Sequence, residues 1–195
     1  MEAAISRGIL KCISTDTIRQ ITRQFDTNPA VHRSSYSGNN DPVVEWRETC
    51  QAIESGIENI VLDSINRGSS LVLEGVHIVP SQSLIEKWKE SGGVAVGVVL
   101  CIPDADVHRK VIFRRGEQTT KGADEQLIKF ERIRSIHDEM VRLGKLNKWL
   151  LIEQKPMLDP RPIDLLTQEI HQTSGVWIEG NSKKLLSKSD IGKMF

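Results

Sequence analysis

The sequence has little of what marks several common classes of protein. It carries no net charge, because 26 Lys and Arg residues are balanced by 26 Asp and Glu residues. Neutrality argues against a protein that holds nucleic acid through a net basic field, and an aromatic content of only 5% leaves no obvious platform for stacking bases. No run is long and apolar enough to span a bilayer, and residues 1–7 lack the features of a signal peptide. We therefore expect no nucleic-acid partner and no membrane.

Cysteine is also scarce. The three cysteines are Cys12, Cys50 and Cys101, and none belongs to a C-x-x-C motif. Cys12 and Cys101 lie in apolar runs, where a free cysteine packs as a small hydrophobic residue. This usage predicts a reducing, cytoplasmic compartment and no structural metal.

Apolar runs of the β type alternate with helical patterns along the chain. Strands are predicted at residues 9–14, 70–76, 94–102 and 149–152, and a long helix with an apolar stripe is predicted to end at Gly68. The alternation is typical of βαβ units and a mainly parallel sheet. It predicts an α/β domain over residues 1–174, followed by a polar tail over residues 175–195. We also expect Gly144 to stop the helix at 125–143, and the run 94–102 to be covered on both faces.

Polar residues follow the predicted strands, at the edge where parallel α/β sheets collect their ligands. Thr15 and Asp16 follow the first strand, and Glu74 interrupts the second, apolar strand. A carboxylate beside a buried strand is costly without a partner. Asp16 could serve only as a helix N-cap, but that alternative does not account for Glu74. We therefore predict a functional edge, with a nearby polar loop at residues 26–42 that is longer than a plain connection needs.

Two of these segments resemble a known family. Ile13-Ser14-Thr15-Asp16-Thr17-Ile18-Arg19 and Leu71-Val72-Leu73-Glu74-Gly75-Val76-His77 are together similar to the 2-phosphoglycerate kinase family, which are P-loop kinases with plant relatives linked to phytic acid accumulation. Ser34-Ser35-Tyr36 is similar to the same pattern, and the similarity covers about residues 5–171. The resemblance implies a three-layer α/β/α fold of the P-loop NTPase type, like that of nucleoside and adenylate kinases.

The resemblance implies transfer of a phosphoryl group from ATP, with Mg²⁺, to a small phosphorylated acid such as 2-phosphoglycerate. Asp16 would contact the acceptor or assist its attacking hydroxyl, and Arg19 would pair with the acceptor's phosphate or carboxylate. Glu74 would stand near Mg²⁺ as the Walker B acid. His77 would face the acceptor pocket. The other implied acceptor contacts are Thr15, Ser35, Tyr36 and Arg132, and the implied basic lid contains Arg114, Arg115 and Lys121.

Each arginine also has a plainer interpretation. Arg19 could be a solvated helix residue, and Arg114 and Arg115 could simply favour the C-terminus of their helix. Arg132 and Arg134 cannot both face one site, because residues two apart lie on different faces of a helix.

The chain contains no G-x-x-x-x-G-K-[ST] motif, whose backbone N–H groups cradle phosphates in P-loop kinases. The nearest string, at residues 175–182, has Asn181 in place of the lysine. In the family this motif precedes the strand that leads into Thr15 and Asp16. We therefore expect the family's first strand and P-loop to be missing, and strands 70–76 and 94–102 to lack their shared neighbour.

Two functions follow from this pattern. The first is a 2-phosphoglycerate kinase that makes 2,3-bisphosphoglycerate, inactive or incomplete in this chain, with weak ATP binding. The second is a non-catalytic relative that senses a metabolite or binds a protein, in inositol phosphate or phytic acid metabolism. The sequence leaves the acceptor and the oligomeric state open.

Overall fold

The structure is a computed structural model, and it describes residues 9, 11–34, 38, 40–117, 129–154, 164–166, 168–170 and 172–173. Three of the implied site residues, Ser35, Tyr36 and Lys121, lie outside the described residues, as does the tail at 175–195. The backbone of the other eight lies within the described residues.

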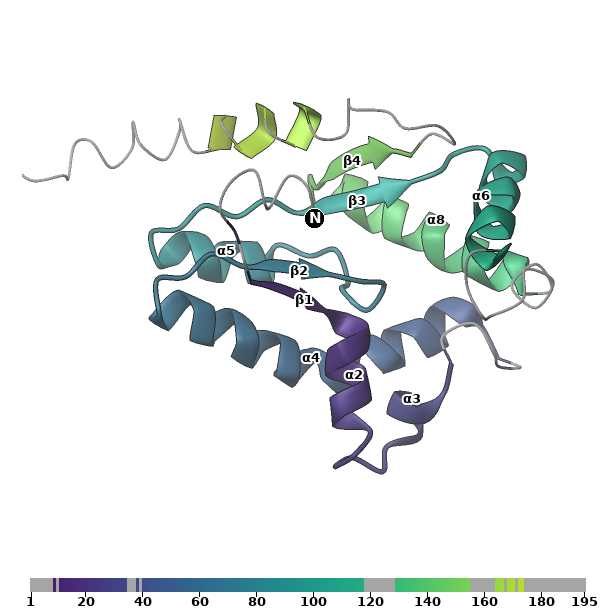
Figure 1. The fold of residues 1–195 in the computed structure, drawn as a ribbon, viewed down its shortest axis with the longest axis horizontal. Coiled ribbons are helices and arrows are strands. Elements are labelled where there is room, and N and C mark those ends of the chain that lie inside the picture. Colours follow the sequence, from purple (N-terminus) through teal and green to yellow (C-terminus); the bar gives the residue numbers. More distant parts are fainter. Residues whose placement is uncertain are drawn as a thin grey trace, which may run out of the picture.

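In the part of the chain that the structure describes, four short strands run parallel in two pairs (Figure 1). β1 (Cys12–Ser14) pairs with β2 (Val72–Glu74), and β3 (Val98–Cys101) pairs with β4 (Leu150–Glu153). Within the described residues, β2 has no ladder with β3. The α/β class with parallel strands, predicted from the sequence, is confirmed.

The helices connect these strands in the predicted order. They are α2 (Thr15–Thr22), α3 (Pro29–His32), α4 (Pro42–Asn66), α5 (Ser83–Glu90), α6 (Ala105–Glu117) and α8 (Phe130–Leu146). Three of them begin at an acidic or amide side chain that accepts backbone N–H groups, namely Asn28, Asp41 and Asp104. Such caps satisfy the unpaired donors of a first turn. None of the described helices is long and apolar enough to cross a membrane.

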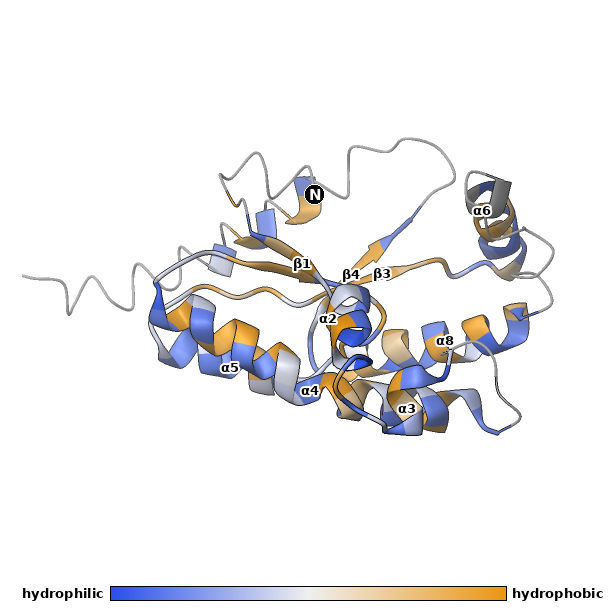
Figure 2. Ribbon diagram, turned by 60° about the horizontal axis from the view of Figure 1, so that its bottom comes forward, coloured by the Kyte–Doolittle hydropathy of each residue, from blue (hydrophilic) through white to orange (hydrophobic). Residues whose placement is uncertain are grey.

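Helices α4, α5 and α8 lie on one side of the strands (Figure 2). The predicted apolar stripe of α4 is confirmed, and it divides between two clusters of buried side chains. Trp46 and Cys50 pack with Ile136 and Leu143 of α8, while Ile53 and Ile57 pack with Ile18 of α2. Helix α4 therefore joins the half of the molecule built on β1 and β2 to the half built on α8.

Cys12 is exposed and does not pack as a small hydrophobic residue, unlike the buried Cys101, and two further predictions about local structure are wrong. Helix α8 continues past Gly144, and Lys148 takes the left-handed conformation, with φ 57°, that ends it. Gly144 instead lets the helix approach β3, since a Cβ there would lie 2.9 Å from the Cγ2 atom of Val99.

The strand β3 is not covered on both faces. Val99 and Cys101 are buried, but Leu100 between them is 58% exposed. The near-continuous apolar run at 94–102 hid this alternation, because a strand with one solvent-facing apolar residue has the same composition as a fully buried one.

Candidate functional site at the carboxyl ends of β1 and β2

The strands β1 and β2 end side by side, because their register sets Ser14 opposite Glu74. Helix α2 begins directly after β1, and its N-cap is Ser14, whose Oγ accepts the N–H of Asp16 at 3.2 Å. The interpretation of Asp16 as only an N-cap is therefore wrong. The Asp16 and Glu74 side chains are both exposed at this edge, where they are accessible to a ligand.

Thr15 and Gly75 lie in contact where the two strands end. Gly75 has φ 132°, in a region that side chains rarely adopt, and a Cβ on it would stand 2.0 Å from the Thr15 Oγ1 atom. Thr15 itself is fully buried. Glycine at position 75 thus lets the chain turn at the end of β2 without displacing the hydroxyl of Thr15.

His77 lies beneath this edge and is only 2% exposed. Its Nδ1 atom is 3.4 Å from the Thr15 hydroxyl and 3.5 Å from Oδ1 of Asp16, while its Nε2 atom is 3.3 Å from Nη1 of Arg19. Burial, followed by the positive charge of Arg19, lowers the pKa of His77 to about 4, although Asp16 acts in the opposite direction. The ring is therefore uncharged at neutral pH.

Arg19 is buried under the edge, with 7% of its surface exposed. Its Nε donates to the carbonyl of Val31 at 2.9 Å and its Nη2 donates to the carbonyl of Arg33. The interpretation of Arg19 as a solvated helix residue is wrong. The guanidinium fastens the segment around α3 onto α2 and brings a fixed positive charge to the edge.

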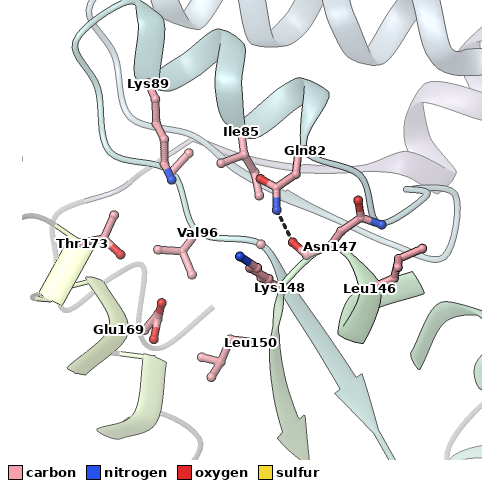
Figure 3. A pocket seen from close by; sticks show the side chains of 12 residues that line it. Gln82, Ile85, Lys89, Val96, Leu146, Asn147, Lys148, Leu150, Glu169 and Thr173 are labelled. Atoms are coloured by element: carbon pink, nitrogen blue, oxygen red, sulfur yellow. Dashed lines mark hydrogen bonds between the residues drawn. The ribbon is translucent and has the colours of Figure 1, made fainter. Parts of the chain in front are cut away.

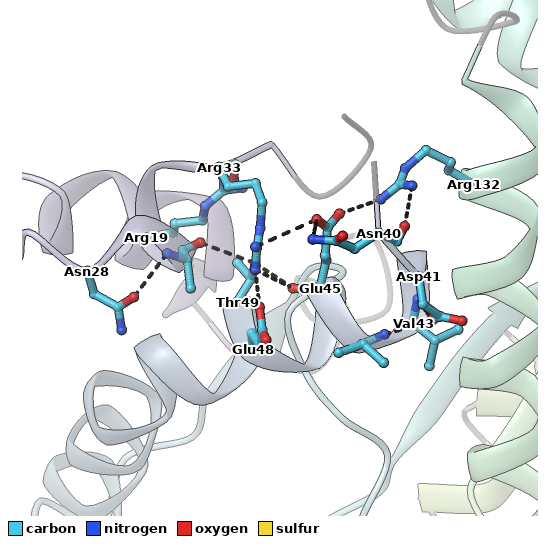
Figure 4. Close-up of polar contacts among 12 residues, drawn as sticks. Arg19, Asn28, Arg33, Asn40, Asp41, Val43, Glu45, Glu48, Thr49 and Arg132 are labelled. Atoms are coloured by element: carbon cyan, nitrogen blue, oxygen red, sulfur yellow. Dashed lines mark hydrogen bonds and ion pairs between the residues drawn. The ribbon is translucent and has the colours of Figure 1, made fainter. Parts of the chain in front are cut away.

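A second arginine group continues from this cluster (Figure 4). The carboxylate of Glu45 is buried, and it lies between Arg132 of α8, which donates to it, and Arg33, whose Nη1 is 3.7 Å away. Arg132 also donates to the carbonyl of Asn40 at 2.8 Å. The two arginines and Glu45 thus tie both described ends of the loop at 33–41 to α4 and α8.

Glu45 was missed by reasoning from the sequence, although a signal for it exists. It stands in the first turn of α4, directly before the fully buried Trp46. A carboxylate beside the apolar stripe of a helix needs a partner of opposite charge. Arg132, predicted to bind the acceptor, supplies that charge within the protein.

The basic residues of the implied lid lie further from the cluster at the ends of β1 and β2. Arg114 is exposed on α6, which Figure 1 shows beyond the carboxyl end of β3. Arg115 lies on the same helix, and its side chain is outside what the structure describes. The structure therefore brings together five of the implied residues, namely Thr15, Asp16, Arg19, Glu74 and His77.

A cavity of about 430 Å³ lies at the opposite ends of the strands (Figure 3). It is lined by residues that precede β3 and β4, including Val96 and Lys148, and by Lys89 of α5. A hydrogen bond from Gln82 to the carbonyl of Asn147 spans one wall. None of the residues that line it belongs to the cluster at the carboxyl ends of β1 and β2, so this cavity is separate from the candidate site.

The edge fits a hydrated Mg²⁺ better than a tightly held ion. Within the described part of the chain, no group of three His, Cys, Asp or Glu residues is arranged to hold a metal. Mg²⁺ commonly keeps several waters and uses one or two carboxylates together with substrate phosphates. Glu74, exposed at the end of β2, is suited to that indirect contact.

Parallel strands in an α/β fold, with a polar site where two of them end, define a class to which many small-molecule kinases belong. Known proteins similar to this chain carry the name of one such kinase. The chain is 29% identical to the 2-phosphoglycerate kinase of Methanocaldococcus jannaschii and 32% identical to that of Methanopyrus kandleri, over 74% and 69% of its length. These matches cover 50% and 45% of the two relatives, so the chain spans about half their length.

The enzyme of the same name from Methanococcus vannielii is 27% identical over 78% of this chain and 53% of its own length. The chain is therefore a homologue of the 2-phosphoglycerate kinases, as the motifs around Asp16 and Glu74 indicate. No family model and no solved structure matches it.

Proposed function

We propose that this chain contributes the acceptor site of a kinase that transfers a phosphoryl group from ATP to 2-phosphoglycerate. The homologues bear that name. The observation that carries the proposal is the cluster at the ends of β1 and β2, in which exposed Asp16 stands over buried Arg19 and His77. A positive charge fixed beneath an exposed carboxylate suits an anionic acceptor that also carries a hydroxyl to be deprotonated.

In this reaction the acceptor's hydroxyl oxygen forms a bond to the γ-phosphorus of ATP, and the bond between that phosphorus and the β–γ bridging oxygen breaks. The proton of the hydroxyl passes to the carboxylate of Asp16, and the products are 2,3-bisphosphoglycerate and ADP. Arg19 supplies positive charge for the acceptor's anionic groups. Mg²⁺, near Glu74, would neutralise charge that develops on the transferred group.

The remaining predicted residues complete this proposal. Thr15 is buried directly beneath the edge. Ser35 and Tyr36 belong to the loop whose ends Arg33 and Arg132 hold. Arg114, Arg115 and Lys121 would bring positive charge toward the transferred group from the segment after β3. Phosphoryl transfer depends mainly on positioning and charge neutralisation, so convergent basic groups of this kind are what it requires.

The proposal is tested by calorimetric titration of the purified 195-residue chain with 2-phosphoglycerate and, separately, with Mg-ATP. We expect 2-phosphoglycerate to bind. D16N should bind it at least as well as the unchanged chain, because one negative charge near the anion is removed, yet should fail to transfer phosphate. No heat from 2-phosphoglycerate, or transfer by D16N at the normal rate, would contradict the proposal.

A second function is favoured by one observation, the lack of a G-x-x-x-x-G-K-[ST] motif in these residues. Without that motif's phosphate cradle, the chain would bind an acceptor-type metabolite and not ATP. Binding of 2-phosphoglycerate without Mg-ATP would support this metabolite-sensing role. Preferential binding of an inositol phosphate over 2-phosphoglycerate would assign the site to phytic acid metabolism.

A further inference from the structure

The two nitrogens of His77 face partners of opposite hydrogen-bonding character. Arg19 approaches Nε2 at 3.3 Å, and its guanidinium can only donate. Asp16 and Thr15 approach Nδ1 at 3.5 and 3.4 Å, with a carboxylate oxygen and a hydroxyl that both can accept. The ring thus lies between a donor on one side and two acceptors on the other.

This arrangement fixes the position of the ring proton. Because Nε2 accepts a hydrogen bond from Arg19, it carries no proton of its own. The neutral ring has one N–H group, which must then be Nδ1–H, at hydrogen-bonding distance from the Thr15 hydroxyl and 3.5 Å from the Asp16 carboxylate. The charged imidazolium, which would donate from both nitrogens, is opposed first by burial and then by the neighbouring Arg19 and Arg23, although Asp16 favours it.

We propose that His77 is a positioning residue, which holds the Asp16 carboxylate through Nδ1–H while Arg19 fixes the tautomer through Nε2. The inference rests on the proposed function, in that Asp16 accepts the proton of the acceptor's hydroxyl there. An uncharged donor orients the carboxylate and leaves its negative charge available. His77 itself is buried, so it acts through Asp16 rather than on the acceptor.

The tautomer is measured directly, without any turnover. Long-range ¹H–¹⁵N correlation spectra of ¹⁵N-histidine-labelled protein distinguish a ring protonated at Nδ1 from one protonated at Nε2, and H77Q identifies the signals of His77 among the five histidines. His137 is an internal reference, because its Nε2 accepts the N–H of Ile102 at 3.0 Å. We expect both rings to be protonated at Nδ1. A proton on Nε2 of His77 would overturn the proposal.

Two variants separate positioning from packing. The amide nitrogen of asparagine can replace Nδ1 of histidine, whereas that of glutamine reaches the place of Nε2. We therefore expect H77Q to lower kcat about 100-fold, the order of loss caused by misplacing a group near the reaction, with little change in KM. H77N should lose at least ten-fold less. H32Q changes an exposed histidine whose ring bonds the carbonyl of Asp26 and does not touch His77 or Asp16, and it should change nothing.

Equal losses in H77N and H77Q, or a greater loss in H77N, would mean that His77 only fills space, and would overturn the proposal. The spectrum also distinguishes a failure of the positioning role of His77 from a failure of the proposed function. An unchanged chain that does not bind 2-phosphoglycerate contradicts the proposed function, whereas the protonation state of His77 is read in either case.

Discussion

The backbone of Gly75 lies against the side chain of Thr15, so closely that a Cβ at position 75 would be 2.0 Å from Oγ1. The glycine also has φ 132°, which disfavours any side chain. We expect G75A to lower the free energy of unfolding by about 2–4 kcal/mol, from backbone strain and from a forced shift of Thr15. Urea denaturation followed by circular dichroism measures this change.

The matched control is G68A. Gly68 also has a positive φ, 60°, but open space surrounds the position where its Cβ would be. Only the conformational cost applies there, about 1 kcal/mol. Equal effects of G75A and G68A would show that the contact with Thr15 is unimportant.

The carboxylate of Glu45 is expected to stabilise the fold through Arg33 and Arg132. E45Q leaves Arg132 without its carboxylate partner and Arg33 with Glu48 alone, and we expect a loss of about 1–3 kcal/mol in the free energy of unfolding. E48Q is the matched control, since Glu48 lies one turn further along α4 and pairs with the same Arg33 from a half-exposed position. It should cost less than about 1 kcal/mol.

The double variant E45Q/R132Q tests the cause of that loss. Removing both partners of a buried pair leaves no unpaired charge, so the double variant should be more stable than E45Q alone. A double variant that is less stable by the sum of both single losses would show that the two side chains do not act on each other.

Stability should depend on pH through two buried histidines. Burial, together with the nearby charges of Arg19 for His77 and of His137 and Arg134 for His108, lowers both pKa values to about 4. The unfolded chain, with ordinary values near 6.5, binds more protons between these limits. The contribution of the two neutral histidines to the free energy of unfolding is therefore complete above about pH 6.5. It is lost as the pH falls toward 4.

The expected slope is up to about 1.4 kcal/mol per pH unit for each histidine. Urea midpoints at pH 7, 6 and 5 measure this slope. H77N should reduce the slope by the contribution of one histidine. The same midpoint at pH 7 and pH 5 would contradict the prediction.

Trp46 should anchor the segment that carries His77. Its indole is fully buried and donates to the carbonyl of Val76 at 2.7 Å. W46F removes the donor and leaves a cavity, with an expected cost of about 2–4 kcal/mol. W149F removes a similar bond, to the carbonyl of Ser81, from a half-buried position and should cost less. The reverse order in thermal unfolding would contradict this.

The sequence predicted the parallel α/β class, the order of the elements and the stripe of α4, because each depends on local periodicity. It also placed Asp16 and Glu74 on one edge, since parallel strands end together. It could not predict the burial of Arg19, which depends on carbonyl groups of Val31 and Arg33 beyond the helix. Likewise, Gly144 follows the rule for helix ends, yet it serves close packing against Val99. Contacts between distant segments determine the burial of Arg19 and the packing of Gly144, and local sequence patterns do not encode such contacts.

Helix α4 has a consequence for how the molecule opens. It contributes to both buried clusters, whereas β1 and β2 adjoin one and α8 the other. A two-stranded ladder is marginally stable by itself, so each strand pair depends on the helices for protection. Amide hydrogen exchange should therefore be slowest in the middle of α4, and the β1–β2 and β3–β4 ladders should exchange as two separate cooperative units, each opening without the other.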